Sequence, residues 1–123
     1  MTAAGFRRIA LALDAAVETA HHGHPDFRVG SRVFATLGYP DRLHGMVSLT
    51  PEQQQTYLRE HAEAFAPVKG KWGEQGATLV RLSAVDEETL GESLTLAWQN
   101  AVARGATRRA SKRTTTPTRA QRR

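Results

Sequence analysis

The N-terminal part of the chain changes from a helical to an extended hydrophobic pattern. From Thr2 to Val17 apolar residues recur every three to four positions, as on one face of a helix, and Thr2 is placed to cap the first turn. From His24 to Tyr39 branched and aromatic residues recur, and Gly30-Ser31 breaks the run with a pair suited to a hairpin turn. The pattern therefore predicts one helix followed by two antiparallel strands.

A third strand and a second helix are predicted next. Leu43 to Leu49 has enough apolar residues to join the sheet. The stretch Thr50-Pro51-Glu52-Gln53 is typical of a helix start, because the threonine can cap, the proline needs no amide partner there, and the glutamine completes a capping box. We expect this helix to reach about Ala64. Its expected buried residues are Tyr57, Leu58 and Ala62.

Glycines mark the loop that precedes the last strand and the last helix. Residues 66–76 contain three glycines and a proline, which indicates a loop or hairpin tip between a short strand at 65–69 and a strand at 77–82. Asp86 then caps a helix that opens with two glutamates and ends at Gly105. We expect Leu94 and Trp98, one turn apart on its apolar stripe, to be buried against the sheet. The full stripe consists of Leu90, Leu94, Ala97, Trp98, Ala101 and Val102.

These elements define an α+β domain with two layers. Their order is helix, three strands, helix, two strands and helix, and the short turns imply an antiparallel sheet with the helices on one face. The 123 residues, 40% of them hydrophobic, suit one such domain.

The absence of cysteine excludes a disulfide framework and fits a reducing cytosol. The longest strictly apolar run near the start, Ile9 to Leu13, is far shorter than a membrane span, so we expect a soluble cytoplasmic protein.

Charge is divided unevenly along the chain. The net charge is +5, yet residues 1–103 hold nine basic and twelve acidic side chains, a net of −3. Residues 104–123 hold eight basic side chains and no acidic one. This last segment contains no Ile, Leu, Val, Phe, Trp or Tyr that could be buried. We therefore predict a folded domain over residues 1–103 and a disordered basic tail over residues 104–123.

Several short motifs follow one another in an order typical of one protein family. They are Glu18-Thr19, Gly23 to Val29, Arg32 to Leu37, Val68 to Gly73, and Ala97-Trp98. Over about residues 5–103 the sequence resembles the MmcQ/YjbR family. The resemblance implies a CyaY-like α+β fold with a double-wing DNA-binding motif, found mostly in bacterial proteins.

The implied wings direct attention to cations at two predicted hairpin tips. Arg28 and Arg32 flank the first turn, and Lys69 and Lys71 flank Gly70. Cationic tips could contact DNA phosphates, while the alternative is that they are ordinary solvated turns.

The tail offers more charge for binding DNA or RNA. Its cations are Arg104, Arg108, Arg109, Lys112, Arg113, Arg119, Arg122 and Arg123. Such side chains can neutralise phosphates without a folded core, and the alternative is an extension that only improves solubility. We expect a nucleic-acid-associated protein that lacks sequence specificity, with the tail as the main contributor. The competing hypothesis is a protein-interaction or chaperone-like module that uses the open face of the sheet.

Other chemistry-bearing residues give weaker indications. His21, His22 and His24 lie near Asp26, but two imidazoles on one face and a carboxylate fall short of a zinc ligand set, so we expect no metal or other cofactor. Trp72 could stack on a base, although we expect it to cover the end of the small core. The chain has no cysteine and no GxSxG nucleophile motif, so we expect no enzyme activity.

Overall fold

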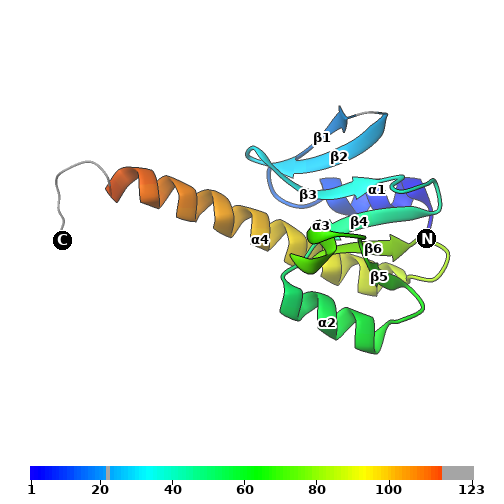
Figure 1. Cartoon of the computed structure of the whole chain (residues 1–123). Helices are drawn as coiled ribbons and strands as arrows, with labels where there is room; N and C mark the ends of the chain where they lie inside the picture. The colour runs from blue at the N-terminus through cyan, green and yellow to red at the C-terminus, as the bar shows by residue number, and fades with distance from the viewer. Residues whose placement is uncertain (22, 115–123) are drawn as a thin grey trace.

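Four helices and six strands make up the described structure, a computed structural model that covers the backbone of residues 1–21 and 23–114 and the side chains of residues 1–20 and 23–105 (Figure 1). Along the chain they are α1 (Ala3–Leu11), β1 (Ala16–His21), β2 (His24–Val29), β3 (Arg32–Leu37), β4 (His44–Ser48), α2 (Pro51–Glu60), β5 (Phe65–Pro67), α3 (Lys71–Glu74), β6 (Ala77–Arg81) and α4 (Glu87–Thr114). The predicted α+β class is confirmed, with one strand and one helix more than the sequence predicts.

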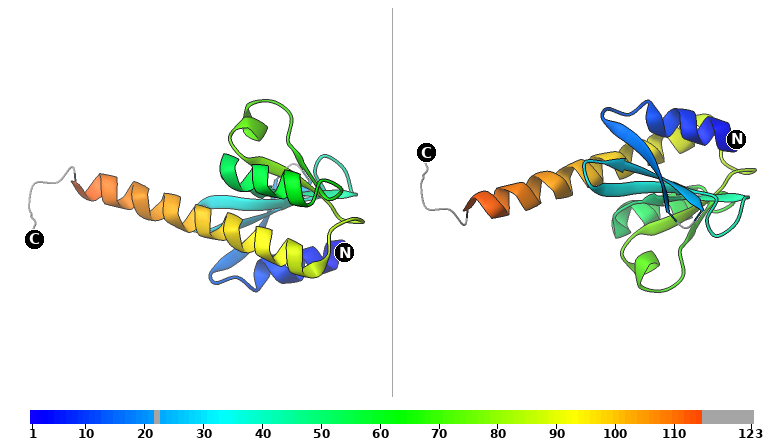
Figure 2. Two further views of the ribbon diagram at one scale, coloured as in Figure 1. Left: turned by 90° about the horizontal axis from the view of Figure 1, so that it is seen from below. Right: turned by 90° about the horizontal axis from the view of Figure 1, so that it is seen from above.

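The strands form one antiparallel sheet in the order β1-β2-β3-β4-β6-β5. Figure 2 shows α1 and α4 against one face and the short helix α3 beyond the opposite face. Phe27 of β2 pairs with Ala35 of β3, which pairs with Val47 of β4, and all three are fully buried beneath the helices. Successive side chains of a strand alternate between the faces, so Asp26 and Thr36 point to the open face. A bulge between β2 and β3 interrupts this alternation, and Phe34 is also fully buried in the core.

The hydrophobic core lies between the sheet and the two helices that cover it. The ring of Phe6 on α1 packs against the ring of Phe27, with centroids 5.9 Å apart. Leu90 and Leu94 of α4 are fully buried in the same cluster. The hydrophobic effect, which acts on the apolar area removed from water, thus holds both terminal helices on one side of the sheet.

The first helix is shorter than predicted, and a strand follows it. α1 ends at Leu11, the chain turns at Ala15, where φ is 60°, and β1 then pairs with β2. Val17 continues the helical spacing of apolar residues, yet it is 50% exposed on this edge strand. Valine and threonine favour strands, so Val17 and Thr19 suit β1 without contributing to the core.

The predicted start of α2 is confirmed. The Thr50 hydroxyl accepts a hydrogen bond from the Gln53 amide at 3.1 Å, and the Gln53 side chain accepts one from the Thr50 amide at 2.9 Å. These reciprocal bonds are the predicted capping box. The helix ends at Glu60, earlier than predicted, so Tyr57 is buried but Ala62 is exposed.

α4 also begins as predicted. The Asp86 carboxylate accepts a hydrogen bond from the Thr89 amide at 2.7 Å. Leu94 is fully buried, but Trp98, predicted to be buried as well, is only partly so. The indole N–H of Trp98 donates to the Asp14 carbonyl at 2.9 Å, so this side chain joins α4 to the loop between α1 and β1.

The C-terminal end of α4 differs from the prediction. The sequence predicts that the helix stops at Gly105, but its backbone continues through Thr114 and projects away from the sheet (Figure 1). Alanine, arginine and lysine make up most of residues 103–113. These residues are strong helix formers, and one internal glycine costs only about 1 kcal/mol. The remainder of the predicted tail, residues 115–123, lies outside the described residues.

α4 is the longest described helix, at 28 residues, yet neither it nor any other described helix is apolar enough over a sufficient length to cross a membrane.

Truncation of the buried stripe of α4 should destabilise the fold. Leu94→Ala removes a fully buried side chain and should cost about 2–5 kcal/mol of unfolding free energy. Leu43→Ala is the control, because Leu43 is 67% exposed and its truncation should change stability by less than about 0.5 kcal/mol. Urea unfolding followed by circular dichroism measures both. Equal losses in the two variants would contradict this placement of α4.

Tyr57 should make the fold sensitive to alkaline pH. Burial, followed by the negative charge of Glu92, raises the pKa of Tyr57 from 10.0 to about 12. Because the pKa is higher in the folded than in the unfolded state, this contribution to stability is complete below pH 10 and is lost as the pH rises from 10 towards 12. Tyr57→Phe should therefore flatten the fall in unfolding free energy over that range. Denaturant titrations at successive pH values measure the slope, and an unchanged slope would contradict the assignment.

Candidate functional site

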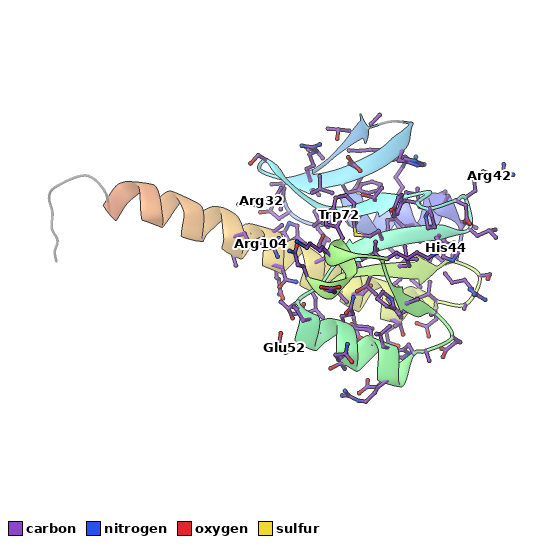
Figure 3. The ribbon with its side chains drawn as sticks, in the orientation of Figure 1. Arg32, Arg42, His44, Glu52, Trp72 and Arg104 are labelled. Carbon is purple, nitrogen blue, oxygen red and sulfur yellow. The ribbon has the colours of Figure 1, made fainter. Side chains whose placement is uncertain are left out.

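The face of the sheet opposite α1 and α4 contains a cavity of about 630 Å³. Asp26, Thr36 and Met46 form part of its floor from paired positions on β2, β3 and β4. Paired residues of neighbouring strands point to the same face, so these side chains stand in a row. Trp72 of α3 and Arg104 of α4 also line the cavity (Figure 3). The site thus combines residues that lie far apart in the sequence.

The polar floor is held together by hydrogen bonds. Asp26 is 7% exposed, and its carboxylate accepts a hydrogen bond from the Thr36 hydroxyl at 2.9 Å. A guanidinium nitrogen of Arg28 lies 3.8 Å from the other carboxylate oxygen, and Arg28 Nε donates to the Thr19 hydroxyl at 3.2 Å. A buried carboxylate is costly unless it is paired, and here the hydroxyl and the guanidinium compensate it.

The position of α3 depends on the buried side chain of Gln54 on α2. Its amide nitrogen donates to the Gly73 carbonyl at 2.9 Å, to the Ala77 carbonyl at 3.0 Å and to the Thr78 hydroxyl at 3.2 Å. These acceptors lie in α3 and at the start of β6. One side chain therefore fixes both the short helix that carries Trp72 and the strand that follows it.

Close packing at Gly73 also fixes the position of this helix. A Cβ atom at Gly73 would collide with the carbonyl oxygen of Val68. Only glycine lets the two backbone segments approach this closely. α3 is therefore held by contacts of its own backbone, while the indole of Trp72 is left 63% exposed.

Arg104 enters the site from α4, whose position relative to the sheet is fixed one turn earlier. The Asn100 side-chain amide donates to the Ser48 carbonyl at 3.1 Å and to the Gln53 side-chain oxygen at 2.8 Å. These bonds tie α4 to β4 and to the first turn of α2. Arg104 is exposed and lines the cavity at the point where α4 leaves the domain (Figure 3).

The four candidate wing cations do not come together in one site. Arg28 lines the cavity, whereas Arg32 pairs with Val29 on β2 and so shares the opposite face of the hairpin. Lys69 and Lys71 are exposed beside Gly70, and Lys71 is the first residue of α3 rather than part of a strand. The DNA-binding role of these residues remains a prediction.

The candidate tail cations divide into three groups. Arg104 lines the cavity. Four others belong to the helical backbone of α4, namely Arg108, Arg109, Lys112 and Arg113. The last three, Arg119, Arg122 and Arg123, lie outside the described residues. Binding of nucleic acid by this set also stays a prediction.

The aromatic residues of the cavity were not assigned correctly from sequence. Trp72 was expected to cover the core, but the structure leaves it exposed at the cavity. Its place in a glycine-rich loop beside Lys71 was the available signal. No sequence motif marks Tyr39, which lies edge-on to His24 with ring centroids 6.1 Å apart, and both line the cavity.

Metal-ligating side chains are not clustered in the part of the chain whose side chains are described. There, no three histidine, aspartate or glutamate groups are placed to hold a metal ion. His24 lines the cavity, and the side chains of His21 and His22 lie outside the described set. Elsewhere, a hydrogen bond with His44, 2.8 Å away, is the main cause that lowers the pKa of the Asp41 carboxyl.

A family model described as YjbR matches residues 11–100. The chain belongs to the YjbR family. The YjbR match confirms the family resemblance seen in the sequence, spans the whole sheet, and ends before Arg104.

The fold of this YjbR chain is similar to the crystal structure of the Deinococcus radiodurans protein DR2400, which is described with the domain DUF419. The TM-score is 0.73 at 22% sequence identity, and the comparison covers 94% of this chain and 89% of that one. A search of curated proteins found no match.

Removal of the Gln54 amide should loosen α3 and destabilise the YjbR domain. Gln54→Leu leaves the carbonyls of Gly73 and Ala77 without this donor and should cost about 1–3 kcal/mol of unfolding free energy. Gln55→Leu is the matched control, because Gln55 is the exposed neighbour on the same helix. Denaturant unfolding measures the energy, and amide hydrogen exchange over residues 68–77 measures the loosening. Equal protection of this segment in both variants would argue against the anchoring role.

Proposed function

We propose that this YjbR protein binds DNA or RNA through its basic segment, residues 104–123, without strong sequence preference and without catalysis. The observation that carries the proposal is the continuation of α4 through Thr114, which gives the first part of this segment a helical backbone beyond the sheet (Figure 1). Eight basic residues and no acidic residue occur in the segment. We place this function in the cytoplasm.

Counterion release provides the physical basis of such binding. Double-stranded DNA carries about one negative charge per 1.7 Å of its axis, and each phosphate that a lysine or arginine neutralises releases condensed cations. Five of the eight basic residues belong to α4, namely Arg104, Arg108, Arg109, Lys112 and Arg113. A backbone that is already helical loses less conformational entropy on binding than a disordered tail would.

The charge of the folded domain also favours the basic segment over the hairpin and loop cations as the main binding element. Residues 1–103 carry a net charge of −3, which repels phosphates at long range. Arg28 already contacts Asp26 and Thr19, so it is partly committed within the fold. We assign the hairpin and loop cations at most a role in orienting the domain on nucleic acid.

Two triple variants that remove equal charge should show whether the basic segment or the hairpin and loop cations contribute more to DNA affinity. Arg108→Gln, Lys112→Gln and Arg113→Gln together should lower duplex affinity on the order of tenfold or more and flatten the salt slope by about 2.7, because three phosphate contacts are lost. Arg32→Gln, Lys69→Gln and Lys71→Gln together should change the affinity by less than about threefold, or ~0.7 kcal/mol. Fluorescence anisotropy with a labelled duplex at about 50 and 200 mM salt, spanning the range where electrostatic affinity falls steeply, measures both.

The full chain sets the reference for this comparison. If all eight cations contact phosphate, its salt slope is about −7. An equal or larger loss in the loop variant would reverse the ranking. Absence of binding by the full chain at about 50 mM salt, where electrostatic contacts are strongest, would overturn the proposal and favour the protein-interaction module instead.

A further inference from the structure

We propose that the open-face cavity holds one unpaired base of a single-stranded nucleic acid, stacked on Trp72. This inference rests on the proposed function and specifies the form of nucleic acid that the protein prefers. It concerns a site formed by the sheet and α3, apart from the phosphate contacts of the basic segment.

The exposed indole is the first reason. Trp72 is 63% exposed, although burial of a tryptophan is a large favourable contribution to folding. The helix that carries it is held by Gln54 and by the close approach at Gly73, so the ring is presented on a fixed backbone. Aromatic rings on such supports bind unpaired bases by stacking, and they do so for every base because each has a π-face.

The size and lining of the cavity are the second reason. Its volume of about 630 Å³ lies within the range of about 300–1,000 Å³ that is typical of small-ligand sites. Val33 and Met46 supply apolar surface to its lining, and Thr36 adds a polar group on the floor. A base inside a duplex is stacked and paired on all sides, so only an unpaired or extruded base can enter such a cavity.

The distribution of charge gives the ligand an orientation. The floor carries little net charge, because Arg28 compensates the Asp26 carboxylate, and that carboxylate can accept a hydrogen bond from the amino group of a base. Arg104 is exposed where α4 leaves the domain, and it attracts phosphate. The base is therefore directed inward and the backbone of the strand outward.

Arg104 also connects the cavity to the basic segment. It is a lining residue of the cavity and the first of the eight basic residues of that segment. A strand whose base occupies the cavity can therefore continue along α4. This continuity favours a nucleic acid over a peptide, because an extended polyanion satisfies both regions at once.

The test compares single-stranded and duplex DNA of the same mixed sequence on the full-length protein. Trp72→Ala should weaken binding to the single strand by about 5- to 100-fold, the usual loss for one stacked base, and change duplex binding by less than about twofold. Trp72→Phe should restore most of the affinity, because it retains an aromatic face. Leu43→Ala is the control, since Leu43 is similarly exposed at 67% and does not line the cavity.

Each outcome of this test has a distinct meaning. Unchanged single-strand affinity in Trp72→Ala, or equal losses for single strand and duplex, would overturn the base-binding site and leave the proposed function standing. Absence of binding to either DNA by the full chain would overturn both. Because Trp72 is exposed, its substitution should leave the melting temperature unchanged, and a melting curve for each variant verifies that the compared proteins are folded.

Discussion

Burial of one stripe of α4 against the sheet is the constraint on which both the cavity and the basic segment depend. Leu90, Leu94 and Ala97 are fully buried there. This packing sets the height of the helix above the strands, and Asn100 fixes its position along the sheet through the Ser48 carbonyl. The direction in which Arg104 and the rest of α4 leave the domain follows from these contacts.

The opposite face of the sheet is organised by polar contacts rather than by a second hydrophobic layer. Thr36 and Arg28 compensate the buried carboxylate of Asp26, and Gln54 satisfies backbone carbonyls on both sides of the turn between α3 and β6. Buried polar groups are stable only when their hydrogen bonds are made, so these contacts demand a defined geometry. These contacts therefore give the open face a cavity of defined shape.

Local signals in the sequence predicted the elements that depend on local contacts. The capping box at Thr50 and the Asp86 cap are confirmed, and so are the strands on both sides of Gly30-Ser31, because each requires only neighbouring residues. β1 was missed because Val17 fits a helical repeat as well as a strand, and its pairing with β2 decides between them. The helix passes through Gly105 because strong helix formers surround it, whereas the prediction gave more weight to the glycine and to the lack of large apolar residues.

The candidate site was less accessible to sequence reasoning. Arg28 and Arg104 were selected for their charge, but no pattern indicated that they line one cavity. That arrangement requires the strand order and the path of α4, both of which are tertiary properties. Gln54 gave no signal either, because a glutamine on an amphipathic helix is ordinarily solvated, and only its buried contacts reveal its role.

The cavity is assembled from β2 near the start of the domain and from α4 near its end, so it exists only when the whole sheet is folded. A molecule held there binds the native state and not the unfolded one, and mass action then adds its binding free energy to the stability of the fold. Under the proposed function, phosphate contacts of α4 beyond Gly105 would involve no part of the core. Binding in the cavity and binding to the basic segment would therefore affect stability differently. Binding in the cavity would be linked to global unfolding, whereas binding to the basic segment would be coupled mainly to its helix–coil equilibrium.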